Sequence, residues 1–596
     1  MPATNDPPAL PDRPAATPPA WWRGAVIYQI YPRSFSDSNG DGIGDLPGIE
    51  RRLDHIARLG VDAIWISPFF KSPMKDFGYD VADYRDVDPI FGTLADFDRL
   101  LARAHQLGLK VMIDQVLSHT SDQHAWFQES RLSRPPGGPK DDGSPSGGMG
   151  APTSGDNPKS DWYVWADPQP DGTPPNNWLS VFGGSAWQWD SRRRQYYLHS
   201  FLASQPDLNF HTPAVQDALL GEVRYWCERG VDGFRFDACN HQFHDASLRS
   251  NPPAGAGKVS TVQADNPYAM QQHLYDKSRP ENLAFLECVR AVLDEFGAVS
   301  IGEVGDENAP PLMASYTAAD KRLHMAYSFS LLTRDGSAAH IQEQVETLDH
   351  ALAQTGGWGC WALSNHDVPR VASRWAHPST TSGQGSDPRQ ARMLLSLLLC
   401  LRGSICLYQG EELGLPEADV PYERLQDPYG LAFWPEFKGR DGCRTPMPWV
   451  ATAPHGGFSS AEPWLPMAPS HLALAVDRQE VDPQAMLHHA RRVLAWRRGL
   501  PVLREGAIRF LTAAETVLLF ERSLPGSPRL RLAFNLGAAP VTFDWPSTGP
   551  WRVLDQAPLS GGRIEPMGPA GRPTLLLQPY GALIAELPPL SDDNNA

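Results

Sequence analysis

Three carboxylates in this chain each stand at the end of a short, mostly apolar stretch of sequence. Asp237 ends "DGFRFD", Glu303 lies in "SIGEV" and Asp367 ends "ALSNHD". Two carboxyl groups placed together can cleave a glycosidic bond, because one attacks the anomeric carbon as an anion while the other protonates the leaving oxygen. A third carboxylate can bind sugar hydroxyls and stabilise the positive charge of the transition state. These residues therefore predict sugar chemistry, provided that they meet in space.

Arg235 stands two positions before Asp237. Side chains two apart on an extended strand point to the same side of it, so the guanidinium and the carboxylate are expected to be neighbours. A neighbouring positive charge favours the ionised form of a carboxylate. We therefore expect Asp237 to be the anion and Glu303, which has no such neighbour in the sequence, to be the protonated acid. For any one of these residues alone, a helix cap or an ordinary ion pair explains the carboxylate equally well.

Short apolar stretches rich in β-branched residues alternate with helical patterns between about residues 25 and 415. The predicted strands are residues 25–31, 63–67, 110–116, 233–237, 299–304, 325–329, 359–363 and 404–408. This alternation predicts an α/β fold, a parallel (β/α)8 TIM barrel, whose active site lies at the carboxyl ends of the strands. The three carboxylates end predicted strands, as do Asp114 and His119 of "VMIDQVLSH". The barrel therefore brings all of these side chains to one mouth.

Two long segments interrupt this alternation: residues 120–204 and residues 416–480, the second of which lacks clear periodicity. Residues 120–204 hold a Gly/Pro/Ser-rich stretch and then an aromatic one, too long for a loop, and predict an inserted subdomain B. After about residue 505 the sequence changes to short apolar runs with turn residues, which predict a C-terminal antiparallel β-sandwich. The expected division is a disordered lead-in at residues 1–20, a catalytic barrel at 21–119 and 205–505, subdomain B at 120–204 and the sandwich at 506–596.

Bulk properties restrict the partners of the chain. Its 596 residues are too many for a single hydrophobic core, and 41% hydrophobic with 20% charged residues is typical of a globular protein. A net charge of −17 without a basic cluster argues against nucleic acid and fits a small neutral ligand. The lead-in has no apolar core of a signal peptide and the apolar run 393–401 is too short to span a bilayer, so we expect a cytoplasmic protein without a membrane partner, either a monomer or a homodimer.

A second cluster of polar residues predicts a metal site. The segment "DSNGDGIGD" places Asp37, Asn39, Asp41 and Asp45 within nine residues. Hard cations such as Ca²⁺ or Mg²⁺ prefer oxygen ligands of this kind, and the glycines allow the loop to fold tightly. The alternative is a polar turn in which the side chains bond only to the local backbone. No organic cofactor is expected, and the seven cysteines have neither the spacing of a zinc site nor that of a disulfide framework.

Together, "DQVLSH", "GFRFDACNH", "IGEV" and "SNHD" resemble the ordered motif set of glycoside hydrolase family 13, the α-amylase superfamily. "QPDLN" at 205–209 and "GRDGCRTPMPW" at 439–449 are similar to its α-glucosidase and oligo-1,6-glucosidase branch. The resemblance implies that Asp237 is the nucleophile, Glu303 the general acid/base and Asp367 the stabiliser of the transition state. It further implies that glucose is held by Asp114, His119, Arg235 and His366.

The resemblance also implies how the sugar pocket is closed. "KDFGYD" is similar to the family segment in which an aspartate and a tyrosine close the non-reducing end, here Asp76 and Tyr79, with Arg444 as the ion-pair partner of that aspartate. A closed end implies exo-action on terminal glucose. The further positions that the resemblance implies are Phe201 and Gln205 in the pocket, and the carbonyl of Ile43 as a ligand of a structural metal ion.

The expected activity is that of a retaining exo-acting α-glucosidase that forms a covalent β-glucosyl-enzyme on Asp237 and also transfers glucose to acceptors. In the branch that the chain resembles, a bulkier valine after the nucleophile goes with α-1,6 bonds, so Ala238 implies α-1,4 links of the maltose type. The expected substrates are maltose and short malto-oligosaccharides, with sucrose and aryl glucosides as further candidates. A transglucosylase or isomerase such as trehalose synthase and an α-1,6-preferring oligo-1,6-glucosidase remain alternatives. A catalytically silent relative would lack one of the three carboxylates.

Overall fold

The computed structural model describes residues 20–133, 157–255, 262, 266–376, 387–512, 514–545, 551–565 and 573–587. The predicted lead-in therefore lies outside the described residues, apart from Ala20. Most of the Gly/Pro/Ser-rich part of subdomain B lies outside them as well.

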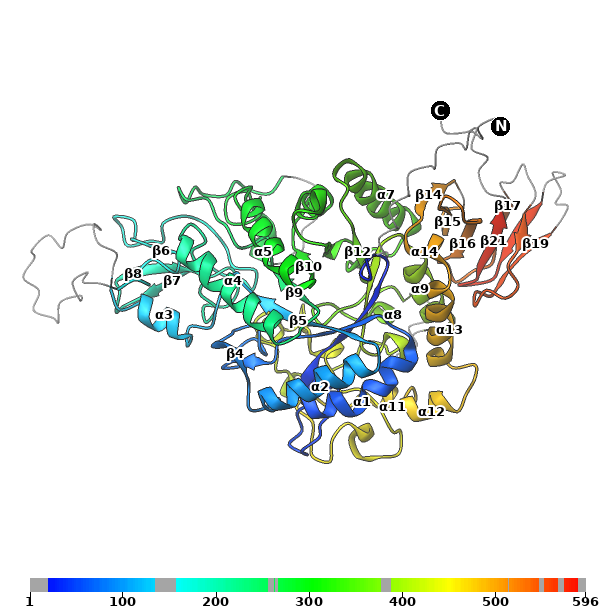
Figure 1. Ribbon diagram of the computed structural model, residues 1–596, viewed down its shortest axis with the longest axis horizontal. Helices are drawn as coiled ribbons and strands as arrows, with labels where there is room; N and C mark the ends of the chain where they lie inside the picture. The colour runs from blue at the N-terminus through cyan, green and yellow to red at the C-terminus, as the bar shows by residue number, and fades with distance from the viewer. Residues whose placement is uncertain are drawn as a thin grey trace, which may run out of the picture.

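The centre of the molecule is an eight-stranded parallel sheet, which confirms the predicted barrel (Figure 1). Its strands are β1 Val26–Ile30, β2 Ala63–Ile66, β5 Lys110–Val116, β9 Gly233–Asp237, β10 Val299–Val304, β11 Met325–Ser328, β12 Cys360–Trp361 and β13 Ser404–Tyr408. They follow one another around the sheet in chain order, and β13 pairs with β1. A parallel bridge between Ala326 and Gly359 joins β11 to the start of β12 and completes the circle.

Helices cover the outside of the barrel. They are α1 Leu46–Leu59, α2 Leu94–Gln106, α4 Pro213–Glu228, α5 Asn282–Phe296, α6 Ala309–Tyr316, α7 Ala338–Thr355, α8 Val371–Arg374 and α9 Pro388–Cys400. Their first turns carry the residues that cap helices: the Thr93 side chain and Asp96 form a reciprocal capping box on α2. On α1 the apolar residues Leu46, Ile49 and Leu53 recur at helical spacing and are fully buried.

The inner face of the barrel is apolar at its base and charged at its mouth. Met112 and Ile301 belong to an apolar cluster inside the barrel. Two positions later on the same strands, and so on the same inner face, stand Asp114 and Glu303. Because side chains alternate between the two faces of a strand, these ionisable residues point into the barrel interior. Each of them needs a partner of opposite charge or a hydrogen bond there.

Subdomain B forms a small projection between the third and fourth barrel strands, at the left of Figure 1. It contains α3 Ala125–Ser130 and a three-stranded sheet of β6 Trp165–Ala166, β7 Trp187–Asp190 and β8 Gln195–Leu198. The returning chain bonds back to the barrel, because Asp207 forms an antiparallel bridge with His119. This bridge brings the nearby Gln205 to the mouth of the barrel. A two-stranded ribbon of β3 Phe70–Lys71 and β4 Asp83–Val87 flanks the same side.

The C-terminal region is an antiparallel β-sandwich, as predicted. Its strands are β14 Ala507–Leu511, β15 Val517–Ser523, β16 Arg529–Asn535, β17 Val541–Asp544, β18 Arg552–Val553, β19 Gly562–Glu565, β20 Thr574–Leu577 and β21 Ala582–Leu587. They form a five-stranded and a three-stranded sheet, with one apolar cluster between them. The buried Arg522 donates to the carbonyl of Cys400 at the end of α9, at 2.6 Å, and to that of Gly506, at 2.7 Å. It therefore joins the sandwich to the barrel.

The segment between barrel and sandwich consists of short helices, consistent with its lack of periodicity in the sequence. They are α10 Pro428–Phe433, α11 Pro469–Leu472, α12 Val476–Glu480, α13 Met486–Arg498 and α14 Pro501–Arg504. Within the described part of the chain, none of the helices has the length and apolar character needed to cross a membrane.

Candidate active site

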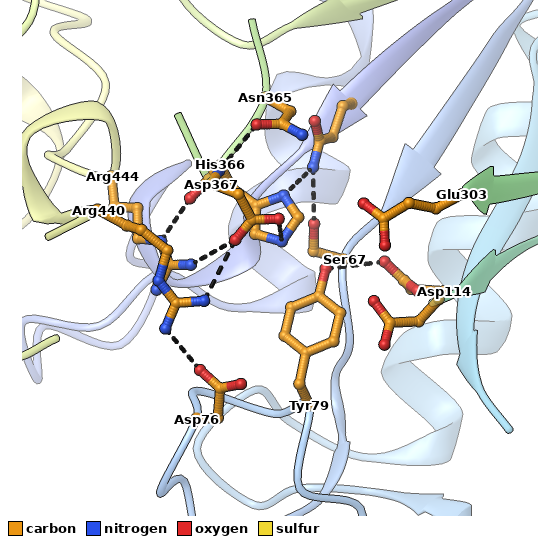
Figure 2. A network of polar contacts seen from close by, with 12 residues as sticks. Ser67, Asp76, Tyr79, Asp114, Glu303, Asn365, His366, Asp367, Arg440 and Arg444 are labelled. Atoms are coloured by element: carbon orange, nitrogen blue, oxygen red, sulfur yellow. Dashed lines mark hydrogen bonds and ion pairs between the residues drawn. The ribbon is translucent and has the colours of Figure 1, made fainter. Parts of the chain in front are cut away.

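A cavity of about 650 Å³ lies at the mouth of the barrel. The predicted residues that line it are Asp76, Tyr79, His119, Phe201, Gln205, Asp237, Glu303, His366 and Asp367. The other predicted residues, Asp114, Arg235 and Arg444, are almost fully buried and contact the lining residues from behind. Figure 2 shows the part of this convergence formed by Asp76, Tyr79, Asp114, Glu303, His366, Asp367 and Arg444. The convergence predicted from the strand ends is therefore observed.

Arg235 is the centre of the buried side of this site. Its Nη1 lies 2.6 Å from Asp237 Oδ1 and 2.8 Å from Asp114 Oδ1, and its Nη2 lies 2.6 Å from Glu303 Oε1. One guanidinium thus holds carboxylates from the neighbouring strands β5, β9 and β10. The Trp65 ring lies against the guanidinium, with its centroid 4.9 Å from Arg235 Cζ. The indole N–H of Trp65 donates to Asp114 at 3.1 Å. The planar fork of arginine fits such a shared role, since it donates in several directions at once.

Arg235 lowers the pKa of Asp237, as expected from the sequence, but burial and two neighbouring carboxylates oppose this effect. Burial raises the pKa of Asp237 well above its usual range, Arg235 lowers it, and the negative charges of Glu303 and Asp114 raise it again. Burial likewise raises the pKa of Asp114 to about 6, although Arg235 opposes this shift. Because one cation is divided among three carboxyl groups, the cluster keeps a proton at a pH where isolated carboxyls have lost theirs.

Asp367 lies in a more positive environment on the other side of the cavity. Its Oδ1 accepts from Arg444 Nη2 at 3.0 Å and from Arg440 Nη1 at 3.2 Å. Burial opposes ionisation of this carboxyl, but its surroundings hold the pKa of Asp367 below the usual range. Burial lowers the pKa of the adjacent His366 well below its usual value, so this histidine is neutral near pH 7 and the two arginines supply the stabilising charge. Asp367 is therefore ionised near neutral pH.

The closed end of the cavity differs from the prediction in one residue. Asp76 pairs with Arg440, at 2.7 Å, and not with Arg444. Arg444 instead donates to Asp367 and, at 2.7 Å, to the carbonyl of His366. Both arginines belong to "GRDGCRTPMPW", and four residues separate them, so the motif alone does not say which one reaches Asp76. Gln205 Nε2 completes the closure by donating to Asp76 at 3.2 Å.

Aromatic and neutral groups form the remaining walls. The Tyr79 ring stacks on the His366 ring with their centroids 5.2 Å apart, and its hydroxyl donates to Asp114 at 3.0 Å. His119 lies 5.1 Å from the ring of Phe201, and its Nε2 donates to the Tyr79 carbonyl at 3.0 Å. Burial lowers the pKa of His119 to about 4, so it is neutral near pH 7. These walls offer flat apolar surfaces with fixed donors and acceptors, which is the pattern of a sugar site.

Several residues that contact the site were not identified from the sequence. Arg440 lies in the motif "GRDGCRTPMPW", and this position was the available signal, but its ion pairs with Asp76, Asp367 and Asp427 depend on the fold. Trp65 and Tyr327 are aromatic residues with a polar group, and they lie on predicted strands at the alternate positions whose side chains face the barrel interior. Gln29 bonds His366 Nδ1 at 2.8 Å from β1. The alternation of side chains along a strand identifies the inner face of the barrel, but it does not distinguish these residues from ordinary core residues.

The predicted metal loop lies outside the cavity. Asp37 accepts from the backbone N–H groups of Asn39 and Gly42, both at 2.9 Å, and Asp41 accepts from that of Ile43 at 2.8 Å. Gly42 has a φ of 90°, and a Cβ there would lie 2.2 Å from a carbonyl oxygen, so only glycine fits. The loop is thus tightly folded, and its carboxylates bond to its own backbone, as the alternative of a polar turn also predicts.

Asp45 has a different environment from the other predicted metal ligands. Its Oδ1 accepts from the Gly48 N–H at 2.6 Å and caps α1, while its Oδ2 accepts from Ser38. Among the described residues, no group of three or more His, Cys, Asp or Glu side chains is gathered as a metal site. The donor set of the loop therefore rests on two carboxylates, Asp37 and Asp41, together with the amide of Asn39 and backbone carbonyls.

Comparison with known proteins places the chain among carbohydrate-active enzymes. The family described as the α-amylase catalytic domain matches residues 29–506. A probable α-glucosidase of Rhizobium meliloti strain 1021 is 56% identical over 531 residues, which are 88% of this chain and 91% of that protein.

Two solved structures are similar over almost their whole length. The α-glucosyl transfer enzyme XgtA is 56% identical with a TM-score of 0.87, covering 95% of this chain and 99% of that one. The trehalulose synthase MutB of Pseudomonas mesoacidophila MX-45 is 31% identical with a TM-score of 0.80, covering 96% of this chain and 100% of that one.

The ion pairs of Arg440 generate a prediction about stability. Asp427 is fully buried, and although burial opposes its charge, Arg440 holds its pKa below the usual range. In an Arg440→Met variant, Asp427 and Asp76 lose this cation, and we expect a loss of about 3–5 kcal/mol in unfolding free energy at pH 8. The loss should be smaller at pH 5, because the unpaired carboxyls then take up protons in the folded variant.

Urea unfolding at both pH values measures this difference. The matched control is Arg424→Met, since Arg424 forms an exposed ion pair with Glu462 and its removal should cost less than about 1 kcal/mol. An equal loss at pH 5 and pH 8 for Arg440→Met would mean that lost packing, and not the unpaired carboxylates, causes the destabilisation.

Proposed function

Because this chain belongs to the family of the α-amylase catalytic domain, we propose that it is a retaining, exo-acting α-glucosidase that releases α-glucose from short α-glucosides. The observation that carries this proposal is the pair of carboxyl groups bridged by one guanidinium: Asp237 and Glu303 each lie 2.6 Å from a nitrogen of Arg235. This arrangement keeps the two groups close. Retaining hydrolysis needs a separation of about 5–5.5 Å, whereas inverting enzymes need about 6.5–9.5 Å.

In the first step, Asp237 attacks the anomeric carbon of the terminal glucose. Its Oδ1 is bonded to Arg235, so Oδ2 is the oxygen that we assign to the attack. Glu303 donates its proton to the glycosidic oxygen as the bond breaks, and a covalent β-glucosyl-enzyme forms. Asp367, held as an anion by its two arginines, stabilises the positive charge that spreads over the sugar ring. The proton retained by the carboxyl cluster is the one that this acid step consumes.

In the second step, an acceptor attacks the same anomeric carbon and releases glucose with its original α configuration. Glu303, now ionised, takes the proton of the acceptor hydroxyl. Water gives hydrolysis and a sugar or alcohol gives transglucosylation. We propose that transfer accompanies hydrolysis, a view supported by the 56% identity to an α-glucosyl transfer enzyme.

Exo-action follows from the closed end of the cavity. The Asp76–Arg440 pair, with Gln205 bonded to the same aspartate, blocks the direction in which a longer chain would extend beyond the terminal glucose. The Ala238 side chain, next to Asp237 in the chain, also lines the cavity. Its small size leaves room for the next sugar of an α-1,4 link, which is the linkage that we propose as preferred.

The likeness to the trehalulose synthase supports a second candidate. An isomerase forms the same glucosyl-enzyme but keeps the released sugar in the cavity, so that it attacks again through another hydroxyl. The two functions therefore differ in their products and not in their first step. An α-1,6-preferring glucosidase is the third candidate and differs from the first only in the preferred bond.

We also propose that the loop of Asp37, Asn39, Asp41 and the Ile43 carbonyl holds a structural Ca²⁺ or Mg²⁺, with Asp45 nearby at the start of α1. The ion would neutralise two carboxylates that otherwise lie close together and would fix the loop against its neighbour Ser459. It would take no part in the chemistry, since none of these residues lines the cavity.

Product analysis tests the proposed function. With maltose, we expect NMR to show α-glucose as the first anomer released, and with maltohexaose the first products should be glucose and maltopentaose. Asp237→Asn should abolish activity, and Glu303→Gln should lower kcat/KM on maltose by about 10²–10⁴-fold, since it removes the acid. Asp86→Asn, an exposed carboxylate paired with Lys71, is the matched control and should retain activity. β-Glucose as the first anomer would contradict retention, and trehalulose-type products from sucrose would favour the isomerase.

Removal of metal tests the loop. Elemental analysis of protein purified without chelator should find about one Ca²⁺ or Mg²⁺ per chain. EDTA should lower the melting temperature by several degrees and added metal should restore it, because a ligand that binds only the folded state stabilises it. An Asp41→Ala variant should show neither the bound ion nor the response to EDTA, whereas Asp83→Ala should behave as the parent protein. A parent protein that contains no divalent ion would refute the proposed site.

A further inference from the structure

Tyr327 lies on β11, directly beside Glu303 in the register of the barrel. It is 1% exposed and does not line the cavity, so it cannot contact a bound sugar. Its ring packs against Trp65, with the centroids 6.2 Å apart. Its hydroxyl, however, lies 2.9 Å from Glu303 Oε1 and 3.1 Å from Arg235 Nη2. A buried phenol therefore touches the two groups on which the proposed acid step depends.

The direction of these hydrogen bonds is fixed by the chemistry of arginine. A guanidinium carries only donors, so the Tyr327 oxygen must accept from Arg235. The hydroxyl proton is then free only for Glu303, and Tyr327 donates to Oε1. Arg235 Nη2 also lies 2.6 Å from the same oxygen. Oε1 thus accepts one hydrogen bond, from Tyr327, and faces the positive charge of Arg235 as well, so a proton on this oxygen is disfavoured.

The second oxygen of Glu303 has a different environment. Oε2 accepts one hydrogen bond, from the backbone N–H of Ala238 at 3.1 Å. Ala238 has a φ of 40°, in the left-handed region that residues with a side chain rarely adopt, and there the chain turns out of β9. The strained turn after the nucleophile strand thus presents its amide to Glu303. One lone pair of Oε2 stays available for a proton.

From this arrangement we propose that Tyr327 is a positioning residue that, with Arg235, reserves Oε1 as an acceptor and so assigns proton transfer to Oε2 of Glu303. The inference rests on the proposed glucosidase function. In the first step, the Oε2–H bond breaks and the proton passes to the glycosidic oxygen, which leaves with the bonding electron pair. In the second step, Oε2 takes the proton of the incoming water or alcohol as that oxygen bonds to the anomeric carbon. Tyr327 keeps its own proton throughout.

Burial supports this last point, because it raises the pKa of the Tyr327 phenol well above its usual value. A phenol that does not ionise can orient a carboxyl group in both of its protonation states. Its hydrogen bond is stronger to the carboxylate than to the acid. Tyr327 therefore also favours departure of the proton from Glu303 during the first step.

A Tyr327→Phe variant tests the proposal, because it removes the hydroxyl and leaves the ring in place. A hydrogen bond to a charged group contributes about 1.5–3 kcal/mol, so kcat/KM on maltose should fall about 10–100-fold. On 4-nitrophenyl α-glucoside it should fall less than about threefold, since that leaving group departs with little protonation. The alkaline limb of the maltose pH profile should move to higher pH by about one unit, because the carboxylate has lost a donor.

The matched control is Tyr316→Phe. Tyr316 is also fully buried, and its hydroxyl accepts from Asn282 at 2.9 Å, away from the cavity. This variant should leave kcat/KM on both substrates and the pH profile unchanged. A second probe keeps the ring and its hydroxyl: 3,5-difluorotyrosine at position 327 is a stronger donor, and it should move the alkaline limb to lower pH.

The outcomes separate this inference from the proposed function. An equal loss on both substrates with unmoved pH limbs in both Tyr327 variants would overturn the positioning role and assign Tyr327 to packing alone. A parent enzyme that cleaves maltose while Tyr327→Phe is as active as the control would overturn it as well. A parent protein inactive on both substrates would instead refute the proposed glucosidase, and the inference would fail with it.

Discussion

The sharing of one buried guanidinium among three carboxylates is the interaction on which the site depends. Arg235 is fully buried and bonds to Asp114, Asp237 and Glu303 from three neighbouring strands. A charge so deep in the barrel is tolerated only because opposite charges surround it, and the carboxylates are tolerated for the same reason. Since there are more carboxylates than cations here, the cluster retains a proton. A retaining glycosidase needs this combination of an anion and a proton-bearing acid held side by side.

A second cationic centre organises the far side of the cavity. Arg440 and Arg444 come from one loop and together hold Asp367 as an anion, while Arg440 also ties Asp76 and Asp427 together. Closure of the pocket and stabilisation of the transition state therefore share the same charges. A change at Arg440 is therefore expected to affect both.

The amino-acid sequence predicted the architecture because strand and helix patterns are local. All eight barrel strands and the C-terminal sandwich were identified, and the carboxylates at the strand ends meet as expected. The partner of Asp76 was not predictable, since two arginines four residues apart in one motif differ only in how the loop folds. The pKa shift of Asp237 depends on how many carboxylates share Arg235. No local sequence pattern shows that number. Tyr327 was missed because a tyrosine on a buried strand is most often a core residue.

The central claim is that Asp237, positioned by Arg235, forms a covalent bond to glucose while Glu303 transfers the proton. Mass spectrometry of peptides after incubation with 5-fluoro-α-glucosyl fluoride, a slow substrate that accumulates the intermediate, tests this directly. The account predicts one added fluoroglucosyl group on the peptide that carries Asp237, and no label in an Asp237→Asn variant. A label on Glu303 or Asp367, or turnover without any covalent intermediate, would contradict it.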